Sequence, residues 1–128
     1  MGKVNAAVVG CGNIGTYAHI PNLKSMPNVE LVSVCDIVEE KAEAASRKYK
    51  VGRHDTDYSR IVSDGDIGLV AICTPPDTHL EIASAALEAG KHVFLEKPLA
   101  ANLQDSVKLY RIAKGSRSKL MPGFCLRY

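Results

Sequence analysis

Short apolar runs alternate with helical segments along the whole chain, and this alternation limits the fold more than any other feature. The runs are rich in β-branched residues and lie at residues 5–9, 31–35, 69–73, 92–95 and 120–124. Strands that are apolar on both faces are typical of a parallel sheet covered by helices on both sides. The sequence therefore predicts an α/β fold, a doubly wound parallel sheet with right-handed crossovers.

The segments between these runs carry signals for helix starts and stops. Asp77 or Thr78 can cap a helix that ends at Gly90, where glycine favours a left-handed stop. Asn102 can cap another helix over residues 103–114. These signals predict two well-defined helices in the second half of the chain.

The remaining helical patterns are weaker. They predict helices over residues 38–50 and 58–63, and a short strand near Arg53. In the segment that follows Asn102, an apolar stripe is formed by Leu103, Val107 and Tyr110. No repeat or linker interrupts the pattern, which indicates one domain over residues 1–128.

Composition excludes several classes of protein. The 128 residues are 46% hydrophobic, enough for the core of one domain. The net charge of +2, without aromatic residues between the cations, argues against nucleic acid as a partner. No apolar run approaches the roughly 20 residues that span a bilayer, so we expect a cytoplasmic protein with no membrane partner. The four cysteines form no C-x-x-C pair, which predicts buried thiols and no metal site.

A glycine motif follows the first apolar run and opens a helical segment. In "VVGCGNIG", Gly10 makes the tight turn, Gly12 lets the backbone approach a pyrophosphate, and Gly15 lets helix and sheet pack closely. The N–H groups of the helix start, at Asn13 and Ile14, then face the anion. The motif predicts a dinucleotide-binding Rossmann fold. Downstream, the sequence predicts an early break of this helix at residue 21, a proline.

Asp36 supports this interpretation because it ends the next apolar run, about 20 residues after the glycines, where a carboxylate binds the adenosine ribose. The alternative is a surface carboxylate that caps the following helix. A carboxylate here repels a 2′-phosphate, and Ile37 brings no compensating charge. NAD is therefore preferred, whereas NADP stays open because Arg47 and Arg53 are the nearest cations.

Two further segments follow apolar runs and so fall at the carboxyl edge of the predicted sheet, where such sheets bind ligands. The first, "CTPPDTH", begins at Cys73 and ends at His79, and the second is Glu96-Lys97-Pro98. Together with the glycine motif and Asp36, these segments resemble the N-terminal domain of the glucose-fructose oxidoreductase, inositol dehydrogenase and MocA (Gfo/Idh/MocA) oxidoreductase family. The resemblance covers essentially the whole chain, and Glu-Lys-Pro after "GKHVFL" is its most specific part.

The resemblance implies roles for these residues. The Thr-Pro-Pro loop and His79 would lie beside the cofactor, Glu96 near the nicotinamide ribose, and Lys97 at a substrate hydroxyl or carbonyl. An ammonium there stabilises charge on the reacting oxygen. Alternatives are a surface role for Lys97 and a packing role for His79, and Pro98 suggests a cis bond. Lys97 is the predicted catalytic residue, and the predicted cofactor-binding residues are Gly10, Gly12, Asn13, Ile14, Gly15, Asp36, Ile37, Cys73, Thr74, Pro75, Pro76, His79, Glu96 and Lys97.

The end of the chain, "KLMPGFCLRY", resembles the last strand of this domain in the family, with Cys125 where Asn is frequent. Family members continue into an α+β substrate domain that is absent here. The resemblance therefore implies the NAD(P)-binding half of an oxidoreductase for a sugar, inositol or similar polyol, with little turnover and with substrate bound only when the missing domain is present. A homodimer is compatible with the apolar surface left exposed. The alternative is a free-standing NAD-binding regulatory or interaction module.

Overall fold

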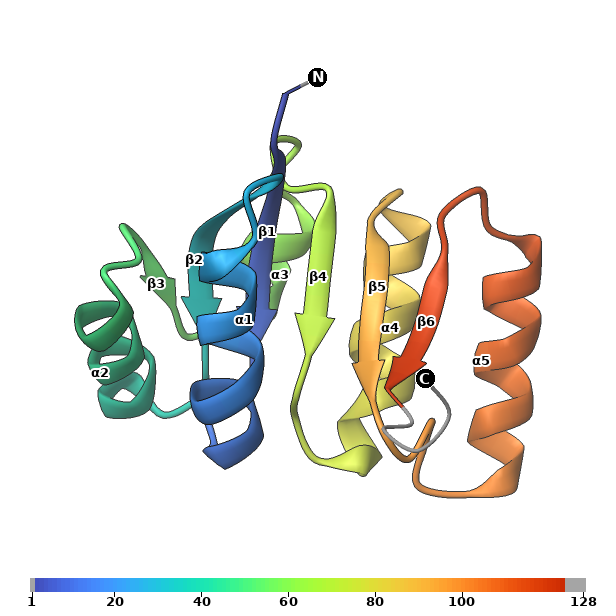
Figure 1. Ribbon diagram of the computed structural model, residues 1–128. Coiled ribbons are helices and arrows are strands. Elements are labelled where there is room, and N and C mark those ends of the chain that lie inside the picture. Colours follow the sequence, from blue (N-terminus) through green and yellow to red (C-terminus); the bar gives the residue numbers. More distant parts are fainter. Residues whose placement is uncertain (1, 124–128) are drawn as a thin grey trace.

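The computed structural model describes residues 2–123, which form one six-stranded sheet between two layers of helices (Figure 1). All strand pairs are parallel, in the order β3-β2-β1-β4-β5-β6. The order reverses beside β1, so the predicted doubly wound sheet is confirmed. The strands are β1 (Val4–Val9), β2 (Val29–Cys35), β3 (His54–Asp55), β4 (Leu69–Ile72), β5 (His92–Glu96) and β6 (Leu120–Gly123).

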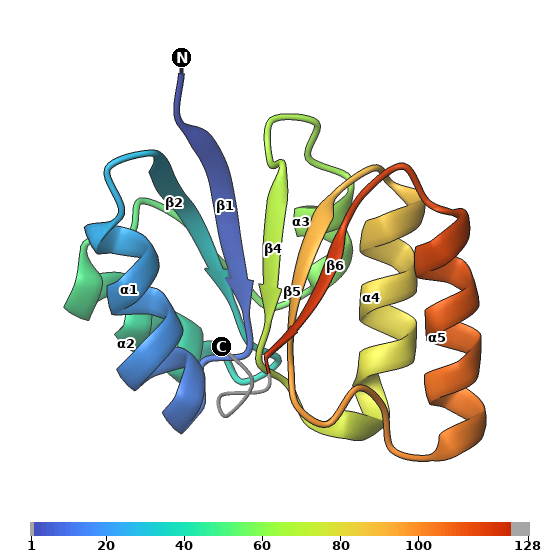
Figure 2. The same ribbon diagram turned by 45° about the vertical axis from the view of Figure 1, so that its right-hand side comes forward.

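Helices cover the two faces of the sheet unequally, as Figure 2 shows. One face carries α1 (Ile20–Ser25) and α2 (Glu39–Tyr49). The other face carries α3 (Tyr58–Val62), α4 (His79–Glu88) and α5 (Leu103–Gly115). Two buried clusters result, one beneath each layer, and both use residues of the central strands. The near-continuous apolar strands are thereby explained, because both faces of β1 and β4 are buried.

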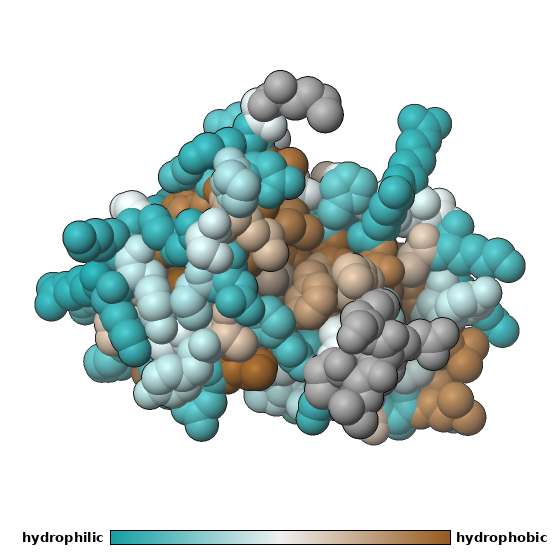
Figure 3. Space-filling model, viewed as in Figure 1, coloured by the Kyte–Doolittle hydropathy of each residue, from teal (hydrophilic) through white to brown (hydrophobic). Residues whose placement is uncertain are grey.

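The sheet face beside α1 is less covered at β5 and β6. Phe94 pairs in register with Met121, and Met121 is exposed. Apolar side chains reach the surface in this region of Figure 3. The homodimer that an exposed apolar surface would permit stays a prediction. Four residues of the predicted last strand and its motif, Phe124, Cys125, Arg127 and Tyr128, lie outside the described residues.

The predicted helices are largely confirmed, with differences at their caps and faces. The Asn102 side chain accepts from the Asp105 N–H at 2.8 Å, and Gly90 has the left-handed φ of +81° expected of a stop. Neither predicted cap of α4 is made, because a 3-10 turn over Pro76–Thr78 precedes the helix. The Thr78 hydroxyl instead donates to the Pro75 carbonyl at 2.7 Å.

The predicted apolar stripe of α5 faces solvent. Leu103 and Tyr110 are largely exposed, and the buried residue of the helix is Leu109. Ile112 and Ala113 pack against the same core as Leu109. The helix is therefore amphipathic on a different stripe, since α5 packs on α4 and turns residues 109, 112 and 113 toward the core that they share with α4 and β5.

The predicted break at Pro21 is wrong. A π-helical turn over Gly15–His19 runs directly into α1, and the Ile20 N–H donates to the Gly15 carbonyl five residues back. A π turn widens the helix, and such turns occur where the series of backbone hydrogen bonds to the residue four positions back is interrupted. The wide turn next to Pro21 lets the helix continue although proline lacks an N–H.

The three motif glycines meet different surroundings. Gly10 has a φ of +104°, and a Cβ there would lie 2.6 Å from the backbone carbonyl carbon of Cys73. A Cβ on Gly15 would collide with the Gly10 carbonyl oxygen. A Cβ on Gly12 would meet no protein atom within 4 Å. Protein packing therefore explains glycine at positions 10 and 15 but not at position 12.

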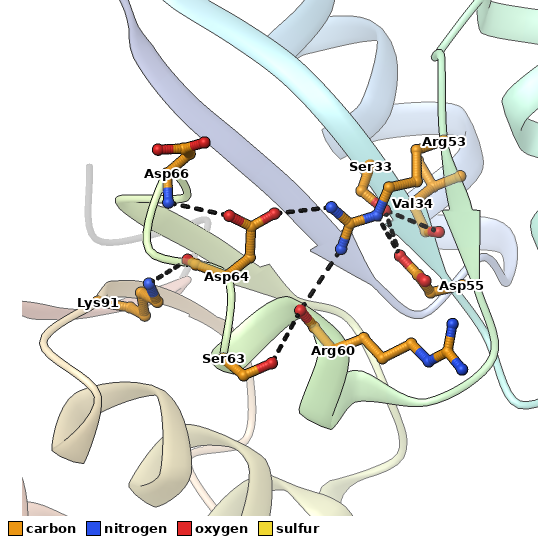
Figure 4. Close-up of polar contacts among 9 residues, drawn as sticks. All are labelled: Ser33, Val34, Arg53, Asp55, Arg60, Ser63, Asp64, Asp66 and Lys91. Atoms are coloured by element: carbon orange, nitrogen blue, oxygen red, sulfur yellow. Dashed lines mark hydrogen bonds and ion pairs between the residues drawn. The ribbon is translucent and has the colours of Figure 1, made fainter.

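A polar network fixes β3 at the edge of the sheet (Figure 4). The Arg53 guanidinium binds Asp55 at 2.7 Å and Asp64 at 2.7 Å, and it donates to the Arg60 carbonyl. The Ser33 hydroxyl donates to the same carboxylate of Asp55 at 3.0 Å. Hydrogen bonds from Arg53 hold the pKa of Asp64 below its usual value. The network joins β3 to the turn after α3.

We expect Gly15→Ala to destabilise the domain by about 2–4 kcal/mol, because the new methyl group displaces backbone rather than a flexible side chain. Gly12→Ala is the matched control and should change stability by less than about 0.5 kcal/mol, since its methyl group enters open space. Urea denaturation followed by circular dichroism measures both. Equal stability of the two variants would contradict the close packing of Gly15 on Gly10.

We expect Arg53→Met to lower the free energy of unfolding by about 1–2 kcal/mol, because Asp55 and Asp64 lose their charged partner. Arg47→Met is the control. Arg47 pairs with Glu43 on an exposed helix surface, and its loss should cost less than about 0.5 kcal/mol. Urea denaturation of both variants at pH 7 tests this, and a loss no larger for Arg53 than for Arg47 would contradict it.

The same variant has a predictable pH dependence. A carboxyl group whose pKa is lowered by folding stabilises the native state above its unfolded pKa, near 3.8 for Asp64, and this contribution is lost as the pH falls through the folded pKa. The stability difference between the wild type and Arg53→Met should therefore shrink below about pH 3.8. Urea denaturation at pH 7, 5 and 3 measures it. A difference that grows at pH 3 would rule out the Arg53 contact as the cause of the lowered pKa.

Candidate functional site

A cleft opens where β1, β2 and β4 end, at the carboxyl edge of the sheet. Its volume is about 660 Å³. Seven of the predicted cofactor-binding residues line it: Gly10, Gly12, Asp36, Ile37, Cys73, Thr74 and Pro75. These residues come from three loops that are distant in the sequence, and the reversal of strand order beside β1 brings them together.

A second cavity of about 470 Å³ lies on the other side of the glycine loop. Gly12 and Asn13 line it, and two cations of α2, Lys41 and Lys48, face it. Gly12 and Lys41 line both cavities. The glycine loop is thus accessible from two sides, with positive charge available beside it.

Asp36 joins the glycine loop to the end of β2. Its Oδ2 accepts from the Cys11 N–H at 2.8 Å, and its Oδ1 accepts from the Val38 N–H at 2.9 Å. Each carboxylate oxygen can accept more than one hydrogen bond. Asp36 therefore has both a structural contact with the glycine loop and free acceptor capacity within the cleft. The alternative that Asp36 caps the next helix has partial support from the Val38 contact, which lies at the start of that segment.

The residues of the cleft fit a dinucleotide, and Gly12 provides the test. It lies on the cleft wall, its φ is not in the left-handed region, and a side chain there would meet no protein atom. Glycine at this position is therefore not required by packing, whereas a pyrophosphate approaching the backbone would require it. The N–H groups of the helix start that follows the glycine loop offer the donors.

The Glu96-Lys97-Pro98 segment lies at the end of β5, outside the two cavities. The Lys97 side chain is exposed, and its ammonium has no partner within residues 2–123. The Lys97-Pro98 peptide bond is cis, as the sequence suggested. Ile14, Gly15 and Pro76 also lie outside both cavities, Gly15 because it is buried beneath the glycine loop.

His79 is completely buried, so its side chain has no surface with which to contact a ligand. One ring nitrogen lies 2.9 Å from the Pro98 carbonyl oxygen and the other 2.9 Å from the Thr74 carbonyl oxygen. This burial favours the alternative of a packing role for His79, and its predicted place beside the cofactor stays a prediction. The ring joins the loop after β4 to the loop after β5 from beneath.

Arg47 and Arg53, because of which NADP stayed a possible cofactor, each bind carboxylates of this chain. Arg53 belongs to the network with Asp55 and Asp64, and those hydrogen bonds raise the pKa of its guanidinium. Arg47 pairs with Glu43. The cation that shares the cleft with Asp36 is Lys41, which sequence reasoning missed. Its position five residues after Asp36, on the first turn of the next helix, was the available signal.

Three thiols lie close to the glycine loop, and their raised pKa values make them unreactive. Burial raises the pKa of both Cys11 and Cys35 to about 12, with the charge of Asp36 adding to the effect for Cys11. Burial also raises the pKa of Cys73. Protonated thiols are poor nucleophiles and poor metal ligands. Among the described residues no group of three His, Cys, Asp or Glu side chains is arranged to hold a metal ion.

Other lining residues of the cleft were also missed. They come from the loop after β2, from the segment between β3 and α3, and from the start of α4: Val38, Thr56, Tyr58, Asp77, Thr78 and Ile82. Burial is the main cause of a raised pKa for Tyr58. Asp77 and Thr78 belong to the CTPPDTH segment but were not among the predicted cofactor-binding residues. The other four positions carry no motif, because they line the cleft only through the folding of neighbouring loops. Within residues 2–123, no helix has the length and apolar character needed to cross a bilayer.

Comparison with known proteins agrees with this geometry. The model of the oxidoreductase family with an NAD-binding Rossmann fold, GFO_IDH_MocA, matches residues 4–124. Inositol 2-dehydrogenase of Salmonella typhimurium is 38% identical over 128 residues, which cover 98% of this chain and 38% of that enzyme. The chain thus spans well under half the length of this relative.

Two solved structures have the same fold. Scyllo-inositol dehydrogenase from Lactobacillus casei, with bound NAD(H) and scyllo-inositol, superposes with a TM-score of 0.87 at 27% identity, over 95% of this chain and 36% of that one. KijD10, a 3-ketoreductase from Actinomadura kijaniata in complex with NADP, gives a TM-score of 0.87 at 25% identity, over 95% of this chain and 38% of that one. The predicted nicotinamide dinucleotide is thereby confirmed for the family, and the chain belongs to the Gfo/Idh/MocA oxidoreductases as an NAD-binding Rossmann domain.

Proposed function

We propose that the cleft at the carboxyl edge binds NAD for hydride transfer to or from a carbon of a sugar, inositol or similar polyol. The observation that carries the proposal is the open position at Gly12, on the wall of the same cleft as Asp36. The glycine loop would hold the pyrophosphate, with Asn13 and Ile14 contributing backbone N–H groups. Asp36 would accept from the adenosine ribose. The inositol dehydrogenases among the relatives support the substrate class.

Lys97 is the residue that we assign to the chemistry. Bound NAD supplies a nicotinamide ring that accepts a hydride, and its reduced form returns one. The exposed, unpartnered ammonium of Lys97, within the part of the chain that the structure describes, would donate to the substrate oxygen and stabilise its charge. Proton exchange needs a second group, and the nearby Glu96 and His79 are already hydrogen-bonded.

These 128 residues on their own would therefore bind the cofactor without significant turnover. We assign substrate selection to the part of the longer relatives that this chain does not match. A cytoplasmic location and a homodimer stay predictions. The free-standing NAD-binding module is not favoured by any separate observation.

We expect NAD to be preferred to NADP because the Asp36 carboxylate shares the cleft with only one lysine, Lys41, among the described lining residues. Arg47 and Arg53 are paired with carboxylates of their own. A 2′-phosphate near Asp36 would meet like charge, which costs affinity. Lys41 offsets part of this repulsion, so NADP binds weakly rather than not at all.

Calorimetric titration tests both the site and the preference. NADH should bind at least about tenfold more tightly than NADPH, corresponding to about 1.4 kcal/mol of repulsion. Asp36→Ser should weaken NADH binding and narrow this ratio, because the ribose acceptor and the repulsive charge are lost together. Asp66→Ser, at an exposed carboxylate in the turn before β4, is the control and should leave both affinities unchanged.

The outcomes separate the two parts of the proposal. A folded wild-type chain that binds no NADH would refute the cofactor site. A wild-type preference for NADPH would refute only the role of Asp36. Folding of each variant is checked by circular dichroism before titration.

A further inference from the structure

His19 and Glu96 form a partly buried pair, and the roles proposed above include neither His19 nor this contact. The His19 Nε2 lies 2.7 Å from the Glu96 Oε1, and the two side chains are 17% and 15% exposed. The His19 ring also packs on Phe94, with ring centroids 4.9 Å apart. His19 ends the π-helical turn that follows the glycine loop, and Glu96 ends β5. The pair therefore joins the helix of the glycine loop to the Glu-Lys-Pro segment.

The second oxygen of Glu96 continues this connection. Its Oε2 accepts from the Lys97 N–H at 3.1 Å. One carboxylate thus receives a donor from His19 on one oxygen and from the backbone of Lys97 on the other. The side-chain ammonium of Lys97 is left free to act elsewhere.

Because the Glu96 side chain is mostly buried, its hydrogen bond with His19 matters for the position of the carboxylate. A carboxylate that is mostly removed from water needs donors, and the loss of one costs more than the loss of a surface contact. His19 needs only an Nε2–H for this bond, and both the neutral ring and the protonated ring can carry one. Without that donor, Glu96 would turn toward solvent and release the Lys97 backbone.

The π turn explains how His19 comes to this position. The Ile20 N–H bonds to the Gly15 carbonyl rather than to the residue four positions back, so the turn holds one residue more than an α-helical turn. His19 is partly buried against Phe94, whereas Tyr17 of the same turn is largely exposed. The unusual turn and the pairing with Glu96 thus occur at one point, directly after the glycine loop.

We propose that His19 is a positioning residue, which fixes Glu96 and the Lys97 backbone relative to the glycine loop so that the nicotinamide end of the cofactor meets a preformed surface. The inference rests on the proposed function, since it needs NAD in the cleft. It adds a residue that lines neither of the two cavities beside the glycine loop. Its loss should therefore weaken binding of the nicotinamide half selectively.

The experiment compares two ligands on the same chain. NADH has both halves, whereas ADP has the adenosine half and a diphosphate but no nicotinamide ribose. His19→Phe keeps an aromatic ring against Phe94 but removes the donor to Glu96. We expect it to raise the Kd of NADH about five- to tenfold and the Kd of ADP less than about twofold. His19→Gln restores an N–H donor and should recover most of the NADH affinity.

A matched control exists in the same chain. His54 Nε2 lies 2.9 Å from Glu39 Oε1, but these side chains are 32% and 57% exposed. His54→Phe removes the same kind of donor at a distance from the Glu-Lys-Pro segment. It should not change the ratio of the NADH and ADP affinities. Calorimetry gives the affinities, and circular dichroism confirms that each variant is folded.

The results distinguish this inference from the function on which it rests. Wild type that binds ADP but not NADH refutes the proposed function and the inference together. Wild type that binds NADH, with His19→Phe weakening both ligands equally or neither, refutes only the positioning role. Failure of His19→Gln to recover any NADH affinity in a folded sample also refutes it. Selective loss in His19→Phe with recovery in His19→Gln supports it.

Discussion

The close backbone approach at Gly10 is the contact on which the rest of the site depends. Its N–H donates to the Cys35 carbonyl at 2.7 Å, which ties the end of β1 to the end of β2. Its α-carbon lies against the Cys73 carbonyl, and the Cys73 N–H donates to Val9 at 2.7 Å, which ties β1 to the end of β4. A side chain at Gly10 would separate these strand ends. The cleft exists because three loops leave the sheet from one tightly packed point.

Much of the fold follows from patterns within single segments. The apolar runs located five strands, and the glycine spacing together with Asp36 located the cleft. Two features that the sequence did not predict are the buried stripe of α5 and the continuous helix at Pro21. The stripe of α5 that is buried is decided by α4 and the sheet, not by the hydrophobicity of Leu103 or Tyr110. The helix continues through Pro21 because a π turn precedes it, and no local propensity predicts that turn.

At the candidate site, too, the sequence predicts some features and packing between segments decides the others. Motif spacing places a residue at the carboxyl edge but does not decide whether its side chain points into the cleft. Thr74 lines the cleft, whereas His79, five residues later, is turned beneath it toward two carbonyl oxygens. Arg53 looked available for a phosphate in the sequence, yet Asp55 and Asp64 engage its guanidinium. Lys41 lines the cleft without belonging to any motif, because α2 starts beside Asp36.

Asp36 shows why structural and binding roles are difficult to separate at this edge. The carboxylate that would select NAD also accepts from the Cys11 N–H, within the glycine loop that would hold the pyrophosphate. Removing its charge therefore alters the loop as well as the repulsion toward a 2′-phosphate. A replacement that accepts NADP has to keep an acceptor for the Cys11 N–H and to place a cation near the ribose. Lys41 already lines the same cleft, so the first of these requirements is the harder one to satisfy.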